Sequence, residues 1–116
     1  MTSAVSRGDI VLVPFPFTDL SHRKIRPAII LNVLREDVLV AFISSVVPLT
    51  APDPTDCVLT ASDPAFPATG LKLTSVFKLA KILCLHQSLI LRQIGHVAPA
   101  LQKELDVRLA RAVGLA

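Results

Sequence analysis

Basic side chains and a histidine gather in one polar segment near the start of the chain. The loop expected at Thr18–Ile25 holds His22, Arg23 and Lys24 in succession. A histidine with an ordinary pKa of about 6.5 carries protons at neutral pH. Arg23 and Lys24 supply positive charges that bind phosphates with salt-dependent affinity. We expect all three side chains to contact an anionic substrate, with His22 as a possible proton carrier, although an ordinary solvated loop would have the same composition.

A second group of cations lies in the C-terminal half. No acidic residue occurs between Asp63 and Glu104, whereas Lys72, Lys78, Lys81 and Arg92 all do. We expect Lys78 to bind a phosphate and Lys81 to point to the opposite face of the same strand. The formal charge of the whole chain, +3, is too small to indicate a polyanionic partner by itself. Its concentration in two segments favours such a partner.

The two cysteines and the remaining histidines give no metal-site spacing. Cys57 and Cys84 each stand in an apolar stretch, without a second cysteine or a histidine cluster at zinc-ligand distance. We expect no secretory signal, since Arg7, Gly8 and Asp9 stand where an apolar segment would be. We therefore expect two reduced core thiols in a cytoplasmic protein, with no metal and no cofactor.

The elements that must position these side chains are mostly strands. Apolar runs and alternation predict them at Ile10–Phe17, Pro27–Leu34, Val38–Ser45, Cys57–Leu59, Leu73–Leu83 and Arg92–Val97. Pro14 and Pro16 lack an N–H on the same edge of the first strand, so this edge cannot form a regular ladder. Arg35, Glu36 and Asp37 suit a tight hairpin between the second and third strands.

One helix is predicted, at Pro99–Val113. Leucines or valine recur there at every fourth position and form one apolar stripe, and Gly114 suits the C-terminal stop. Many short strands with proline-rich loops and a terminal helix predict a small, strongly bent β-barrel or sandwich, with the helix laid on the sheet.

Length and composition limit the class of protein. The 116 residues suffice for a single domain, which we expect to span residues 1–116. A hydrophobic content of 52% excludes intrinsic disorder. The longest charge-free run, Val38–Pro52, is fifteen residues, shorter than the about 20 that cross a bilayer, so we expect a soluble protein and no membrane partner. With no Trp and no Tyr, the chain has no aromatic stacking platform, and a nucleic-acid partner would be held mainly by phosphate contacts and hydroxyls.

Several stretches together resemble one known family. The chain opens with a Gly-Asp strand start in Arg7–Leu20, continues through a polar loop, and resumes with an Arg-Pro pair that begins a Val/Ile-type strand in Lys24–Leu31. Further matching stretches are Val40–Ser45, Leu71–Ser75, Ser88–Ile90 and Ile94–Val97. This pattern is similar to that of the MazF/PemK toxin family, and it covers nearly the whole chain.

The resemblance implies a fold, an activity and partners. Such proteins are SH3-like small β-barrels of mainly β structure with a C-terminal helix; they form homodimers, cleave single-stranded RNA without a metal, and are silenced by a cognate antitoxin protein. In metal-free cleavage the substrate's 2′-hydroxyl attacks the phosphorus and leaves a 2′,3′-cyclic phosphate and a 5′-hydroxyl. The protein must stabilise the added charge, assist proton removal and align the strand.

The resemblance also suggests which residues act. Arg26 matches the family's Arg-Pro arginine, and its planar, permanently charged guanidinium suits stabilisation of the phosphorane. The alternative is that Arg26 only caps the strand or pairs with Asp19. Ser44 matches the family's catalytic threonine, while Ser45 is an alternative bearer of that role and a substrate contact. A strand-end serine that satisfies the local backbone is the alternative for Ser44.

One departure from the family pattern bears on catalysis. A branch of the family uses an Arg-x-Asp pair for acid–base work, and the matching residues here are Lys78, Leu79 and Ala80. Loss of this carboxylate leaves two further hypotheses open. The chain is then a catalytically inactive family member that binds protein or nucleic acid, or a gyrase poison like CcdB, which shares the barrel.

Overall fold

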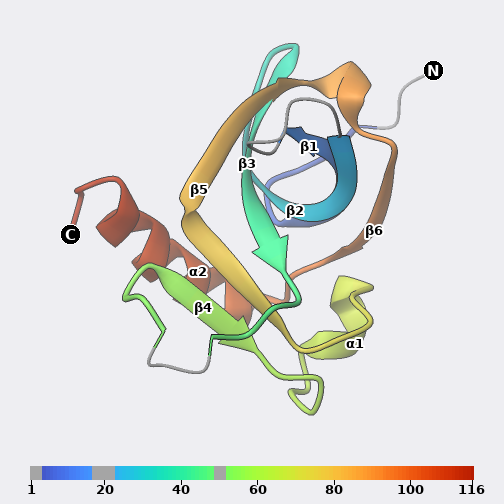
Figure 1. Ribbon diagram of the computed structural model, residues 1–116. Helices are drawn as coiled ribbons and strands as arrows, with labels where there is room; N and C mark the ends of the chain where they lie inside the picture. Colours follow the sequence, from blue (N-terminus) through green and yellow to red (C-terminus); the bar gives the residue numbers. More distant parts are fainter. Residues whose placement is uncertain (1–3, 17–22, 49–51) are drawn as a thin grey trace.

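The computed structural model describes residues 4–16, 23–48 and 52–116, with the side chains of residues 16 and 23 left out. Six strands, two α-helices and one 3₁₀ turn make up the described chain (Figure 1). The strands are β1 (Asp9–Pro16), β2 (Arg23–Leu34), β3 (Asp37–Ser44), β4 (Asp56–Leu59), β5 (Ser75–His86) and β6 (Arg92–His96). The other elements are α1 (Phe66–Thr69), η1 (Gln87–Leu89) and α2 (Pro99–Ala112). The mainly β fold with a C-terminal helix is confirmed.

The strands form one antiparallel sheet in the order β4-β5-β3-β2-β1-β6. Figure 1 shows that this sheet curls strongly into a half-barrel. The long strand β5 accounts for part of the curl, because its first half pairs with β4 while its second half continues along β3 to His86. The small bent barrel predicted from the strand pattern is thus confirmed.

The two prolines of β1 limit the edge of that strand as predicted. The N–H of Leu91 donates to the carbonyl oxygen of Leu12 at 2.9 Å, so even-numbered residues of β1 face β6. Pro14 and Pro16 face the same way and have no N–H to give. Pairing of β1 with β6 accordingly ends at Leu12, whereas pairing with β2 continues to Pro16.

Alternate residues of the central strands fill two hydrophobic clusters on opposite faces of the sheet. Ile10, Ile29 and Phe77 belong to the cluster that the helix α2 covers with Leu101 and Leu105. The second cluster consists of the alternate positions, Val11, Val13, Phe15, Ala28, Ile30, Val38 and Val40. Both faces of the sheet are therefore apolar, which accounts for the high hydrophobic content.

Two arginines of α2 fix the chain before β4. Arg108 Nη1 donates to the carbonyl oxygen of Asp56 at 3.0 Å, and Arg111 Nη1 donates to that of Pro54 at 3.3 Å. Arg108 also pairs with Glu104 one turn earlier at 2.7 Å. The predicted helix ends close to the expected residue, and Gly114 adopts the left-handed conformation (φ 79°) of a C-terminal stop.

The short helix α1 packs directly on β6 through two glycines. A Cβ atom on Gly95 would overlap the backbone of Ala68 and Thr69, and one on Gly70 would overlap the backbone of Ile94. Gly70 also has a left-handed φ of 72° and ends α1. This backbone-to-backbone contact holds the segment 70–74 against β6.

The structure corrects three sequence-based expectations. Cys57 is buried, but Cys84 is exposed, because it lies in the second half of β5, where most side chains reach solvent. β5 spans Ser75–His86 rather than Leu73–Leu83, since Leu73 belongs to the loop after α1. The helix α1 was not among the predicted elements, because four residues with a proline carry no helical periodicity.

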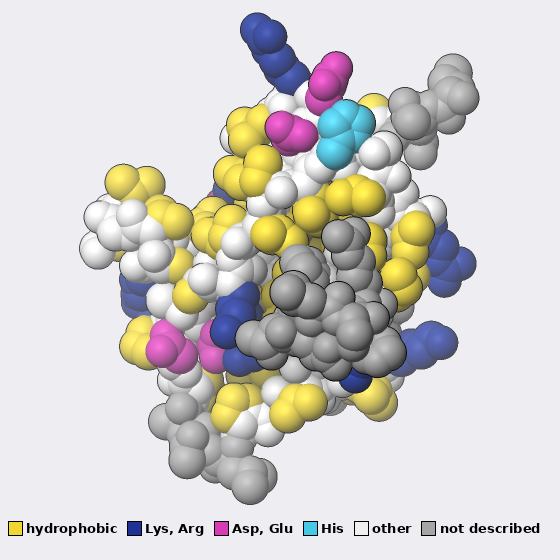
Figure 2. All heavy atoms as spheres, turned by 45° about the horizontal axis from the view of Figure 1, so that its top comes forward, with side chains coloured by type: hydrophobic (Ala, Val, Ile, Leu, Met, Phe, Trp, Pro, Cys, Tyr) yellow, Lys and Arg dark blue, Asp and Glu magenta, His cyan; other side chains and the backbone are white. Residues whose placement is uncertain are grey.

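Many apolar side chains remain at the surface. Figure 2 shows them spread over the visible face between the basic side chains. The exposed large ones are Ile25, Leu34, Val46, Val47, Leu73, Ile82, Leu91, Val107, Val113 and Leu115. Within the described residues, no helix has the length and hydropathy needed to cross a membrane.

Candidate functional site

The site begins where β2 and β3 separate. Their pairing ends at Ala28 and Phe42, although β2 starts at Arg23 and β3 runs on to Ser44. The Ile30 carbonyl accepts a hydrogen bond from the Gly8 N–H, so the backbone polar groups of Ile30 point toward β1. Because these groups point to alternate sides along a strand, the backbone of Pro27, three residues earlier, faces β3. Pro27 has no N–H to donate there, and the ladder stops. Beyond this point β2 remains paired with β1, and β3 remains paired with β5, so a gap opens between β2 and β3.

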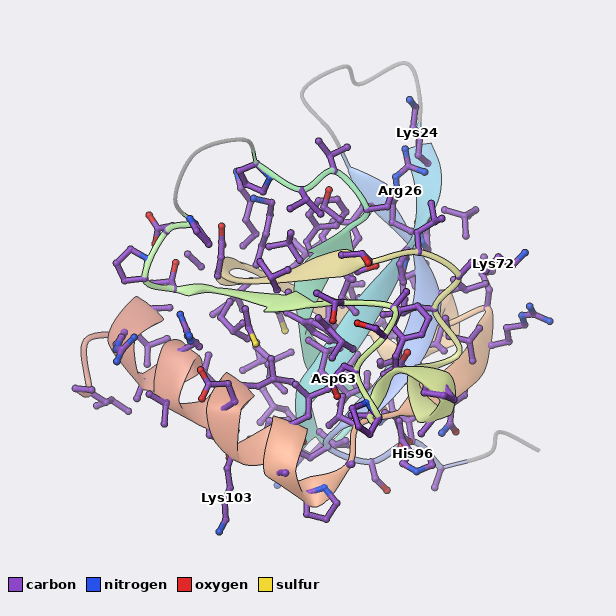
Figure 3. All side chains as sticks on the ribbon, turned by 90° about the horizontal axis from the view of Figure 1, so that it is seen from below. Lys24, Arg26, Asp63, Lys72, His96 and Lys103 are labelled. Atoms are coloured by element: carbon purple, nitrogen blue, oxygen red, sulfur yellow. The ribbon has the colours of Figure 1, made fainter. Side chains whose placement is uncertain are left out.

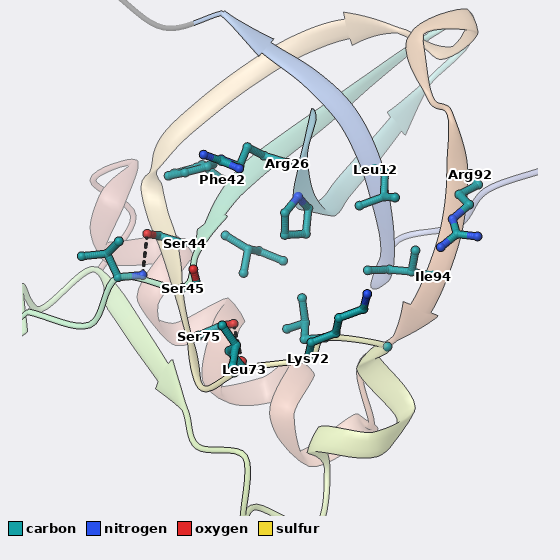
Figure 4. A pocket seen from close by; sticks show the side chains of 15 residues that line it. Leu12, Arg26, Phe42, Ser44, Ser45, Lys72, Leu73, Ser75, Arg92 and Ile94 are labelled. Carbon is teal, nitrogen blue, oxygen red and sulfur yellow. Dashed lines mark hydrogen bonds between the residues drawn. The ribbon is translucent and has the colours of Figure 1, made fainter. Parts of the chain in front are cut away.

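A pocket of about 530 Å³ occupies this gap (Figure 4). Its apolar floor and walls come from five elements or loops, and its polar lining consists of three cations and three hydroxyls. The lining residues are Leu12, Arg26, Pro27, Phe42, Ile43, Ser44, Ser45, Val46, Gly70, Leu71, Lys72, Leu73, Ser75, Arg92 and Ile94. None of these fifteen is Asp or Glu, so no carboxylate in this lining offsets the positive charge.

Arg26 stands on the wall of the pocket formed by β2. It pairs in register with Val13 of β1 and is half-buried. In Figure 4 its guanidinium lies on the same side of the pocket as Phe42. The Phe42 ring packs on Phe15, with centroids 5.1 Å apart. Arg26 thus carries a fixed charge at the edge of an apolar cluster, where an anion would be only partly hydrated.

The two serines predicted from the sequence both line the pocket. The backbone N–H of Val46 donates to Ser44 Oγ at 3.1 Å, drawn as the dashed line in Figure 4. Since this bond uses the oxygen as an acceptor, the hydroxyl proton of Ser44 is directed elsewhere and can be donated to a bound anion. Ser45 follows at the exposed rim. A third hydroxyl, that of Ser75, donates to the Leu73 carbonyl at 2.7 Å.

The remaining predicted site residues are not in the pocket lining. Lys78 forms an ion pair with Asp56, 3.6 Å from Nζ to Oδ2, on β5 and β4. Lys24 is exposed two residues before Arg26 on the same face of β2 (Figure 3). Arg23 begins β2, but its side chain lies outside the described atoms, and His22 lies outside the described residues.

Two further cations, Lys72 and Arg92, line the pocket without a role assigned from the sequence. Lys72 lies on the segment after α1, and Arg92 begins β6. Both cations lie in the stretch without acidic residues between Asp63 and Glu104, which was the only feature of the sequence that pointed to them. That stretch could not distinguish them from Lys78 and Lys81, because it says nothing about which loops meet.

Elsewhere in the described chain, two titratable groups have shifted pKa values. Burial raises the pKa of the Cys57 thiol above its ordinary value. Hydrogen bonds from the Thr55 hydroxyl and N–H lower the pKa of the Asp53 carboxyl. No group of three or more His, Cys, Asp or Glu among the described residues is arranged to hold a metal ion.

Comparison with solved structures shows the same fold in toxins. The chain is similar to an endoribonuclease of a mycobacterial species solved with its cognate antitoxin (23% identity, 97% of this chain and 98% of that chain, TM-score 0.72). It is also similar to the Mycobacterium tuberculosis toxin MazF-mt6 (21% identity, 93% and 98%, TM-score 0.71). A third similar structure is MazE-MazF from Deinococcus radiodurans (15% identity, 99% and 100%, TM-score 0.72). No curated protein sequence matches the chain.

At these identities the solved structures establish the fold alone. The family is established by the sequence itself, because a family model described as PemK-like, MazF-like toxin of type II toxin–antitoxin system matches residues 6–113. This match covers every described strand and the whole of α2. The chain therefore belongs to the PemK-like, MazF-like toxins of type II toxin–antitoxin systems.

Proposed function

We propose that this toxin is an endoribonuclease that cleaves single-stranded RNA through the substrate's own 2′-hydroxyl. The observation that carries the proposal is the pocket, which places the Arg26 guanidinium and the Ser44 hydroxyl around one cavity with no carboxylate in its lining. A reaction whose nucleophile belongs to the substrate needs charge stabilisation and alignment more than it needs a nucleophilic side chain.

In the proposed step, the 2′-oxygen forms a bond to phosphorus and loses its proton, and the bond from phosphorus to the 5′-oxygen breaks. The products are a 2′,3′-cyclic phosphate and a 5′-hydroxyl, whose oxygen takes up a proton. Arg26 pairs with the non-bridging oxygens as negative charge builds on them. Ser44, held by the Val46 N–H, donates a hydrogen bond to the same phosphate. Ser45, Lys24 and Arg23 contact the adjacent backbone, and His22 remains the proposed proton carrier.

The partners are proposed on the same basis. Two of the similar structures contain an antitoxin or the MazE–MazF pair, which supports a cognate antitoxin for this chain. The large exposed apolar side chains support partners that cover them, an antitoxin segment and a second copy in a homodimer. Lys78, paired with Asp56, is proposed to bind RNA only if that ion pair opens.

The experiment uses purified protein, a long single-stranded RNA and EDTA in the buffer. We expect fragments whose 5′ ends accept phosphate from polynucleotide kinase without prior phosphatase treatment, because they carry 5′-hydroxyls. Arg26→Ala should abolish these fragments, while Lys103→Ala, a change of the same charge on the exposed face of α2, should not.

RNA that stays intact at high protein concentration would contradict the proposal. The absence of the carboxylate at Ala80 makes this outcome worth a direct comparison. Binding without cleavage would favour a non-catalytic nucleic-acid-binding member of the family. Inhibition of gyrase supercoiling with intact RNA would favour the gyrase poison.

A further inference from the structure

Lys72 and Arg92 are pocket cations that the proposed cleavage step does not use. Both line the same cavity as Arg26, but Arg92 begins the edge strand β6 and Lys72 lies on the segment between α1 and β5. Figure 4 shows the Arg26 guanidinium on the Phe42 side, and the side chains of Lys72 and Arg92 on the β6 side near Ile94. The positive charge of the pocket is therefore divided between two walls.

The sheet register keeps these walls apart. Arg92 of β6 is paired with Leu12 of β1, and Leu12 is paired with Pro27 of β2. Two strand spacings of about 4.8 Å separate the backbones of Arg92 and Pro27, roughly 10 Å in total. Leu12, Pro27 and Ile94 form an apolar surface between the cations. A ligand that satisfies both walls must therefore have anionic groups separated by an apolar or aromatic part.

Lys72 is brought to the β6 wall by the backbone contact between Gly70 and Ile94. Because a Cβ at Gly70 would overlap the Ile94 backbone, the segment that follows Gly70 starts in direct contact with β6. Lys72 is only two residues further along. The position of this lysine is thus set by the packing of α1 on the sheet rather than by a free loop.

The two cations differ from three other basic residues of the described chain, whose charges are already paired. Lys78 pairs with Asp56, Arg108 pairs with Glu104, and Arg7 pairs with Asp106. In the part of the chain that the structure describes, neither Lys72 nor Arg92 forms an ion pair or a side-chain hydrogen bond. Their charge is available to a ligand in the pocket.

We propose that Lys72 and Arg92 form a second phosphate-binding subsite, which holds the RNA backbone on the β6 side while the scissile phosphate lies at Arg26. This inference rests on the proposed function for its substrate class, since single-stranded RNA offers phosphates separated by sugars and bases. The nucleotide between the two phosphates places its sugar and base over the apolar surface of Leu12, Pro27 and Ile94. The subsite positions the strand and takes no part in the bond changes.

The first test measures binding without cleavage. A fluorescent oligonucleotide with 2′-deoxy substitutions throughout cannot be cleaved by the proposed route, so its affinity reports binding alone. Lys72→Gln and Arg92→Gln should each weaken binding about two- to fivefold, and the double variant about tenfold. The slope of log affinity against log salt should fall by about 0.7 for each cation removed. The matched control is Lys103→Gln, which removes the same charge from α2, on the opposite side of the molecule from Lys24 and Arg26 in Figure 3.

The second test locates the phosphate. A methylphosphonate placed at one linkage at a time removes one backbone charge. The wild-type protein should lose affinity when this linkage is one or two nucleotides from the cleavage site, and the double variant should be insensitive at that same linkage. In single-turnover cleavage, each single variant should need about two- to fivefold more protein to reach half of its maximal rate.

The outcomes separate the two proposals. If Lys72→Gln and Arg92→Gln weaken binding no more than Lys103→Gln, with unfolding temperatures equal to that of the wild type, the subsite is refuted whether or not RNA is cleaved. If the wild type binds the deoxy oligonucleotide with the predicted dependence on both cations but cleaves no RNA, the subsite stands and the nuclease function fails.

Discussion

The contact between α1 and β6 allows a quantitative prediction for Gly95→Ala. Gly95 lies in β6 with an ordinary strand φ, so alanine causes no dihedral strain there. The added Cβ would lie closer than 3.0 Å to backbone atoms of Ala68 and Thr69. These backbone atoms cannot rotate away from the new Cβ as a side chain could, so the whole of α1 must move.

The size of this movement follows from the contact distances. Ordinary Cβ contacts begin at 3.4 Å, so α1 must withdraw from β6 by roughly 1 Å. The Thr69 hydroxyl, fully buried, donates to the Phe66 carbonyl at 2.6 Å and keeps the short helix rigid. Overpacking of this kind costs about 2 kcal/mol, which we expect as the loss in free energy of unfolding. For a chain of this length the loss corresponds to a melting temperature lower by roughly 8 °C.

The assay is urea unfolding at one fixed protein concentration, together with a thermal melt. Gly114→Ala is the control, because nothing lies within 4 Å of its added Cβ, although its φ, unlike that of Gly95, is positive at 79°. The control should lose about 1 kcal/mol or less, from the left-handed backbone alone. Gly95→Ala should also weaken binding of the deoxy oligonucleotide, because the displaced segment carries Lys72.

A Gly95→Ala variant no less stable than Gly114→Ala would refute this reasoning. It would mean that α1 does not rest on β6 at this distance. The explanation given for the position of Lys72 would then fail with it.

Three further predictions concern the pocket and the core. Arg26→Lys keeps the charge but loses the guanidinium geometry that pairs two phosphate oxygens. Single-turnover cleavage should therefore slow by about 10²-fold, while the affinity for the deoxy oligonucleotide changes little. An equal loss of cleavage rate and of affinity would assign Arg26 to binding. Ser44→Ala should slow cleavage about tenfold or more and Ser44→Thr should not, as measured by the same assay; equal rates in both would leave the hydroxyl without a role. Burial raises the pKa of the Cys57 thiol, so the unfolded chain loses this proton at a lower pH than the folded protein does. The contribution of the thiol to the free energy of unfolding is therefore complete below about pH 9 and is lost as the pH rises further. Urea titrations at pH 8 and pH 10 should show this loss, and Cys57→Ala should remove it, while exposed Cys84 reacts with a thiol reagent in the folded protein.

The sequence predicted the strands well because both faces of the sheet are apolar. Six apolar or alternating runs specify six strands, and the helix follows from its four-residue stripe. The sequence could not predict α1, because these four residues owe their conformation to the contact between Gly70, Gly95 and their neighbours. Cys84 shows a similar limit, because whether the second half of β5 is covered depends on where α2 lies.

For the site, sequence reasoning identified residue types better than it identified neighbours. Arg26, Ser44 and Ser45 were named from a resemblance, and the structure brings all three to one pocket. Lys78 was chosen over Lys72 and Arg92 although all three lie in the same acid-free stretch. The pairing of Lys78 with Asp56 depends on the register of β4 against β5, which four strand residues do not specify.

The proline at position 27 has a kinetic consequence. In the described part of the chain, the gap beside Arg26 arises from a missing N–H in a covalent ring. The gap lies between β2 and β3 in the ground-state geometry of these two strands, and cations line it. If the proposed RNA substrate binds there, its association rate constant should rise as ionic strength falls.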